Sequence, residues 1–109
     1  MEFNQDIKLL IDGKWIQSSE RDSLPLINPA TEEILSNVPI ANDKDLDNSL
    51  ISSHKAFKIW SKFPPLKRQS IMLKAVEIIK ARQEEIAKTL TMEMGKTLRE
   101  SRQEINQVI

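Results

Sequence analysis

Residues 26–34 read LINPATEEI, and this stretch does most to decide the fold. Apolar residues on either side of an Asn-Pro-Ala-Thr turn predict two strands that fold back on each other, because asparagine and proline favour turns. An earlier pair has the same form, in which KLLI (8–11) and KWIQ (14–17) flank an Asp-Gly turn. Asp-Gly between apolar runs is a strong hairpin signal. We therefore predict two β-hairpin-like strand pairs, separated by a polar loop over 18–23.

The remainder of the chain has the apolar spacing of helices, with a period of about 3.6 residues. Asn42 is placed to cap the first helix, because its side chain accepts a hydrogen bond from the first turn. The apolar face of this helix recurs at 4-3-4-3 spacing and consists of Leu46, Leu50, Ser53, Phe57 and Trp60. A second helix follows Pro64 and carries so broad an apolar stripe that we expect it to be covered on more than one side.

Two further helices complete the pattern. A third extends from Gln83 to Met94, and Gly95 follows it as a helix stop. Thr97 begins a capping box, which predicts a fourth helix. We thus predict about four α-helices after the strands, an order that by itself is typical of α+β proteins. The fourth helix has no end signal before Ile109, so we expect the chain to be the front part of a longer protein.

Composition restricts the classes of function. The chain has 109 residues, of which 39% are hydrophobic and 29% charged, as in ordinary globular domains. Lys plus Arg and Asp plus Glu number 16 each, and this balance disfavours a nucleic-acid binder. The sequence contains no cysteine, which excludes disulfides, thiolate metal sites and cysteine nucleophiles within it. It has neither a signal-peptide pattern nor an apolar run long enough for a membrane span, so we predict a cytoplasmic protein.

Several residues could carry chemistry, but each has a simpler explanation. His54 is the only histidine and lacks partners at metal-ligand spacing, so we interpret it as a packed or boundary residue. Asp43, Asp45 and Asp47 lack the glycine and glutamate of an EF-hand loop and suit the positive end of a helix dipole. Lysines and arginines between 62 and 82 are interrupted by glutamates, as on a solvated helix face. With two glycines, the chain has no phosphate-binding loop.

Four blocks occur in a fixed order: IDGKW (11–15), INPATEEI (27–34), an Ala-Phe pair followed by Trp60, and EMGK (93–96). Together they resemble the N-terminal part of aldehyde dehydrogenases, over about residues 9–109. The resemblance implies an α/β parent fold, with residues 1–109 forming an incomplete N-terminal portion of the cofactor-binding domain. It also implies a parent enzyme that oxidises an aldehyde to a carboxylate with NAD or NADP.

In that family a cysteine thiolate attacks the aldehyde, hydride passes to the nicotinamide, and a glutamate activates water. None of these catalytic groups, nor the cofactor site, has a counterpart in this sequence. We therefore predict no catalytic and no cofactor-binding residues, and no dehydrogenase activity for the chain alone. The segment 90–96 resembles succinate-semialdehyde dehydrogenases most, so the parent substrate is predicted to be succinate semialdehyde.

The resemblance also implies one binding site. Some family members bind a monovalent cation through a backbone carbonyl before Asn-Pro and an acidic side chain before Gly-Lys. These positions fall on Ile27 (or Leu26) and Glu93, with a third ligand from sequence absent here. Oxygen ligands suit a hard cation. Alternatively, Glu93 is an ordinary carboxylate near a helix end.

The apolar stripes also suggest partners. We expect the chain to associate with itself, or to dock as a non-catalytic helical module on a full-length aldehyde dehydrogenase. We expect no nucleic-acid and no membrane partner.

Overall fold

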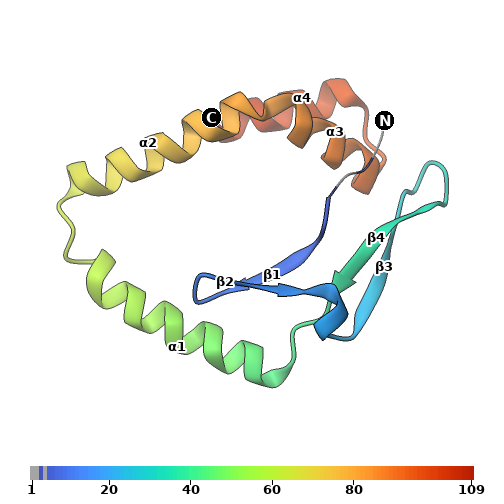
Figure 1. The fold of residues 1–109 in the computed structure, drawn as a ribbon. Coiled ribbons are helices and arrows are strands. Elements are labelled where there is room, and N and C mark those ends of the chain that lie inside the picture. The colour runs from blue at the N-terminus through green and yellow to red at the C-terminus, as the bar shows by residue number, and fades with distance from the viewer. Residues whose placement is uncertain (1–2, 4) are drawn as a thin grey trace. The chain divides into compact units, whose positions relative to one another are not determined.

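The computed structural model describes residues 3 and 5–109 of the chain (Figure 1). The elements follow in the order β1 (Lys8–Ile11), β2 (Lys14–Gln17), η1 (Ser18–Glu20), β3 (Ser23–Ile27), β4 (Ile34–Pro39), α1 (Asp43–Trp60), α2 (Pro65–Ala81), α3 (Gln83–Met94) and α4 (Leu98–Val108). The predicted order of two strand pairs followed by four helices is confirmed. The short 3-10 helix η1 was not predicted and lies in the polar loop. Across the described part, no helix combines the length and apolarity that crossing a bilayer requires.

The chain divides into two compact units. The strand unit contains residues 5–26 and Ile34–Phe63, and therefore β1, β2, β4, α1 and almost all of β3. The helical unit contains the turn Ile27–Glu33 and the segment Pro64–Ile109.

In the strand unit, β1 and β2 form an antiparallel hairpin whose strand pairs are Lys8–Gln17, Leu9–Ile16, Leu10–Trp15 and Ile11–Lys14. Because side chains alternate between the faces of a strand, Leu10 and Trp15 share one face, and both are exposed. The opposite face carries Leu9, Ile11 and Ile16, all half-buried. This second face is the one that contributes residues to a groove with α1.

Helix α1 packs against β1 with its polar side. Asp45 is buried, and Ser49 and Ser52 are half-buried. The Ser52 hydroxyl donates a hydrogen bond of 2.8 Å to Asp12 in the β1–β2 turn. Serine and aspartate therefore make the contacts that an amphipathic helix usually makes with apolar residues.

The predicted apolar face of α1 is exposed. We call Leu46, Leu50, Ser53, Phe57 and Trp60 the α1 seam, and Leu50 in it keeps 61% of its surface accessible. The expectation that α2 is covered on more than one side is wrong for this chain, since none of its residues is buried and Leu66 is 78% exposed. The sequence pattern correctly identified apolar stripes on α1 and α2, but the rest of the described chain does not cover them.

The helical unit owes its packing mainly to α3 and α4, which lie side by side (Figure 1). Ala87, Met92, Ser101 and Ile105 are the buried residues of this pair. Polar contacts also join the two helices: Thr91 and Ser101 share a hydroxyl hydrogen bond of 2.9 Å, and Arg102 pairs with Glu84. Only residues 95–97 separate the two helices.

Candidate functional site

The two residues predicted to bind a cation lie in the helical unit. Ile27 is the last residue of β3 and is 48% exposed, and Glu93 is half-buried in the last turn of α3. Leu26, the alternative to Ile27, is half-buried and belongs to the strand unit.

The turn after Ile27 is fixed by hydrogen bonds of its own. The Asn28 side-chain oxygen accepts the Ala30 N–H at 2.9 Å, and the Asn28 carbonyl accepts the Glu32 N–H at 2.8 Å. The Asn28 N–H donates to the Glu33 carbonyl at 2.9 Å. Asparagine supports such a turn because its short side chain bonds to backbone two residues on.

This turn lies against the end of α3. Gly95 has φ +72°, and a Cβ built on it would stand 2.8 Å from Cγ of Pro29. The contact brings two segments together that are more than sixty residues apart in sequence. Ile27 comes two residues before Pro29, and Glu93 two residues before Gly95. Both predicted ligands therefore flank one close contact, although binding itself stays a prediction.

A metal site made of side chains alone is absent from the described part of the chain, where no three histidine, cysteine, aspartate or glutamate side chains converge. A cation at Glu93 would therefore need carbonyl or other oxygens besides this carboxylate. His54 is exposed on α1, so of the two predicted alternatives, a packed or a boundary residue, the packed one is wrong.

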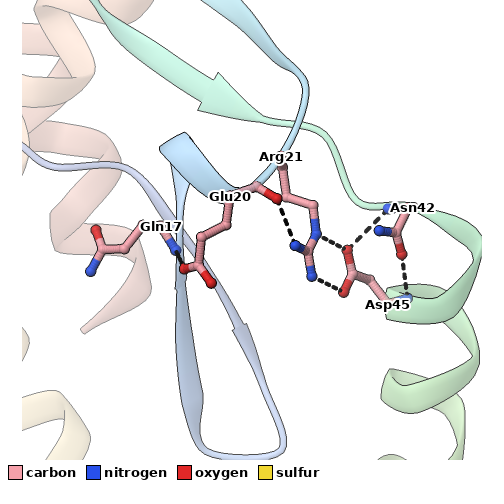
Figure 2. Close-up of polar contacts among 5 residues, drawn as sticks. All are labelled: Gln17, Glu20, Arg21, Asn42 and Asp45. Carbon is pink, nitrogen blue, oxygen red and sulfur yellow. Dashed lines mark hydrogen bonds and ion pairs between the residues drawn. The ribbon is translucent and has the colours of Figure 1, made fainter.

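The most buried ion pair of the described residues was not predicted from the sequence. Figure 2 shows Arg21, just after η1, facing Asp45 in the first turn of α1. Arg21 Nε donates to Asp45 Oδ2 at 2.7 Å, and Nη2 donates to Oδ1 at 2.8 Å. The Asp45 side chain is only 4% exposed. A two-pronged pair of this kind fixes the orientation of both side chains, because the guanidinium and the carboxylate are planar.

Asp45 also completes the cap of α1. The Asn42 N–H donates to Asp45 Oδ2 at 3.1 Å, and the Asp45 N–H donates to Asn42 Oδ1 at 2.9 Å. The Arg21 hydrogen bonds, followed by the bond from the Asn42 backbone, lower the pKa of Asp45 from its ordinary 3.8 to about 2. The helix-start interpretation of Asp45 was therefore correct but incomplete. The role of this cluster is structural, since it ties the segment before β3 to the start of α1.

Comparison with known proteins identifies relatives over nearly the whole chain. The aldehyde dehydrogenase family profile matches residues 15–109. Malonate-semialdehyde dehydrogenase 1 of Geobacillus thermodenitrificans is 37% identical over 105 residues, covering 96% of this chain and 22% of that protein. The human mitochondrial methylmalonate-semialdehyde/malonate-semialdehyde dehydrogenase is 38% identical over 92 residues, covering 84% of this chain and 17% of that protein.

Solved structures agree in fold. Aldehyde dehydrogenase 21 of Physcomitrella patens, in complex with its reaction product succinate, superimposes with a TM-score of 0.87 at 30% identity. That match covers 93% of this chain and 21% of the moss enzyme. An NAD-dependent benzaldehyde dehydrogenase from Corynebacterium glutamicum gives a TM-score of 0.86 at 28% identity, with 94% and 22% covered. The chain thus spans about a fifth of the length of these relatives and has the fold of their N-terminal part.

Proposed function

Because the chain belongs to the aldehyde dehydrogenase family, we propose that it forms the N-terminal portion of a cofactor-binding domain and has no dehydrogenase activity by itself. The sequence contains no cysteine to attack an aldehyde. Its role is that of scaffold: it completes an enzyme whose catalytic groups lie on other sequence.

The exposed α1 seam is the observation that carries this proposal. The polar side of α1 is already engaged by the hairpin, so the seam is the face left for another partner. Contiguous exposed apolar residues mark interaction surfaces, because leaving them in water is unfavourable. The chain covers only about a fifth of the length of its relatives. The partner that we propose for the seam is therefore the remainder of an aldehyde dehydrogenase.

The substrate class of the assembled enzyme is proposed to be a semialdehyde of a short dicarboxylic acid. The curated relatives described above carry malonate semialdehyde in their names, which favours malonate semialdehyde over the succinate semialdehyde predicted from residues 90–96. The product named for the moss enzyme keeps succinate semialdehyde as the second candidate. NAD is the proposed cofactor, as in the benzaldehyde dehydrogenase, and we expect this chain alone to bind neither NAD nor NADP.

A complementation experiment tests the proposal. The purified chain should form no NADH or NADPH from malonate semialdehyde. The Geobacillus enzyme can be shortened by the segment that matches this chain. Co-expression of the two should restore NADH formation, because the α1 seam can then pack against the rest of the enzyme. Activity of the chain alone, or failure of every co-expressed pair to form a complex, would contradict the proposal.

Two variants make this experiment specific. Leu50→Asp puts a carboxylate into the seam and should reduce the restored activity by about tenfold or more, since burying an unpaired charge costs several kcal/mol. Lys58→Asp changes charge on an exposed residue of α1 outside the seam and should leave restoration intact.

A second candidate is a non-catalytic module that docks on a full-length relative or on a second copy of itself. The same exposed seam favours it. Co-purification with the full-length Geobacillus enzyme, together with no complementation of the shortened one, would select this alternative. Cytoplasmic location stays a prediction, and the human relative is named as mitochondrial.

We also propose a monovalent cation between the Ile27 carbonyl and the Glu93 carboxylate of the assembled enzyme. The Pro29–Gly95 contact supports it, because it holds the two segments together. In the complemented enzyme, replacing choline chloride with potassium chloride should raise the melting temperature. Glu93→Gln should abolish that increase. Glu77→Gln, which changes an exposed residue of α2, is the control and should show the same increase as the unmodified protein. An equal potassium effect in all three proteins would exclude the site.

A further inference from the structure

The strand unit contains a groove that none of the proposals above uses. It has a volume of about 290 Å³ and lies between the β1–β2 hairpin and α1. Ile11 and Ile16 line it from the hairpin, and Ile51 lines it from the helix. This volume is just below the range of roughly 300–1,000 Å³ typical of ligand pockets, so only a small ligand would fit. We call this cavity the hairpin groove.

Two lysines reach the hairpin groove from different elements. Lys14 is opposite Ile11 in the hairpin register, so strand alternation places it on the face that lines the groove. Lys55 follows Ile51 by four residues, so it lies on the same face of α1. Neither lysine forms an ion pair among the described residues. Two lysine side chains without an ion-pair partner in the described part of the chain thus line one cavity.

The acidic residues of the groove do not balance these two charges. Asp45 lines it, but both carboxylate oxygens accept hydrogen bonds from Arg21. Asp12 also lines it and accepts a bond from Ser52. One carboxylate therefore remains against the two lysines, which leaves an excess of one positive charge.

We propose that the hairpin groove binds a small aliphatic carboxylate, with the ammonium groups of Lys14 and Lys55 holding the carboxylate and the isoleucines contacting the carbon chain. A ligand with one negative charge would neutralise the excess positive charge of the groove. The apolar lining favours an organic anion over an inorganic one. The inference does not depend on the proposed function, because no residue that lines the groove belongs to the α1 seam or to the two predicted cation ligands.

Lysine labelling by reductive methylation, quantified by mass spectrometry on the 109-residue chain, tests this binding. Sodium butanoate on the order of 10 mM should slow labelling of Lys14 and Lys55 by about twofold or more, as expected for millimolar affinity. Lys44 and Lys58, both exposed on α1, serve as internal controls and should react unchanged. Acetate and inorganic phosphate at matched ionic strength should protect less, since neither fills the apolar part.

Variants show whether the two lysines act together. Lys55→Gln should abolish butanoate protection at Lys14, and Lys14→Gln should abolish it at Lys55, while Lys58→Gln preserves protection at both. Far-ultraviolet circular dichroism of each variant confirms that the helices are retained. Uniform slowing at all lysines, equal protection by phosphate, or protection that survives the reciprocal substitutions would overturn the proposal.

Discussion

Replacing Gly95 with alanine is expected to destabilise the helical unit by roughly 2–5 kcal/mol, the sum of two penalties. The first is conformational: φ is +72°, and an L-residue in the left-handed region loses about 1–2 kcal/mol. The second is steric: the new Cβ would stand 2.8 Å from Cγ of Pro29, and the rigid proline ring cannot rotate away. The turn over residues 28–33 must therefore move away from α3.

Gly13→Ala is the matched control for this prediction. Gly13 also has φ +72°, but nothing lies within 4 Å of the Cβ position there. Alanine at Gly13 should therefore show only the conformational penalty of about 1–2 kcal/mol. The difference between the losses of unfolding free energy in the two variants measures the steric penalty of the contact between residue 95 and Pro29.

Hydrogen exchange measures the two effects locally. In Gly95→Ala, the amides of residue 95 and of Glu32 should exchange faster, because their hydrogen bonds to the Thr91 and Asn28 carbonyls lie on either side of the close contact that the new Cβ would disturb. In Gly13→Ala, the same amides should be unaffected. Equal exchange of these amides in Gly95→Ala and in the unmodified chain would show that the turn does not rest on α3.

The stability of the strand unit should fall as the pH is lowered from about 4.5 to about 2, because Asp45 must then take up a proton. Its pKa is about 2 in the folded chain and 3.8 ordinarily, so the unfolded chain binds the proton more readily. A carboxyl group with a lowered pKa stabilises the folded state above its unfolded pKa. That stabilisation disappears as the pH passes down through the folded value.

Tryptophan fluorescence during urea unfolding reports this change selectively, because Trp15 and Trp60 both lie in the strand unit. The selectivity matters because the pKa values of Glu84 and Glu100 are also lowered, by hydrogen bonds from Arg102 and Thr97 respectively, and both glutamates lie in the helical unit.

Asp45→Asn supplies the control. It should have a lower urea midpoint than the unmodified chain at pH 7, since Arg21 loses its charged partner, and a much flatter pH profile below 4.5. A profile in Asp45→Asn as steep as that of the unmodified chain would mean that other groups cause the acid sensitivity.

The boundaries of the elements were predictable because local chemistry determines them. Asn42, Pro65, Gly95 and Thr97 act on the residues beside them, and each is found at the predicted helix end. The Asp-Gly turn gave the β1–β2 hairpin residue for residue in the same way. Caps and turns of this kind can be predicted without knowing the rest of the fold, because they act only on neighbouring residues.

The pairing of Arg21 with Asp45 was not predictable, because the two residues are 24 positions apart and neither belongs to a spacing motif. What covers the α1 seam was not predictable either, for a different reason. Periodicity identifies an apolar face but does not identify what covers it. Binding of a cation by Ile27 and Glu93 stays a prediction, and the structure shows that their two segments meet at the contact between Pro29 and Gly95.

The α3–α4 pair has a consequence for the order in which the chain assembles. Only residues 95–97 join the two helices, so bringing them together closes a short loop and loses little chain entropy. The strand unit contains the local β1–β2 hairpin but also depends on contacts between distant segments, such as Arg21 with Asp45. Contacts local in sequence form faster than distant ones. We therefore expect the helical hairpin of α3 and α4 to form before the strand unit is complete.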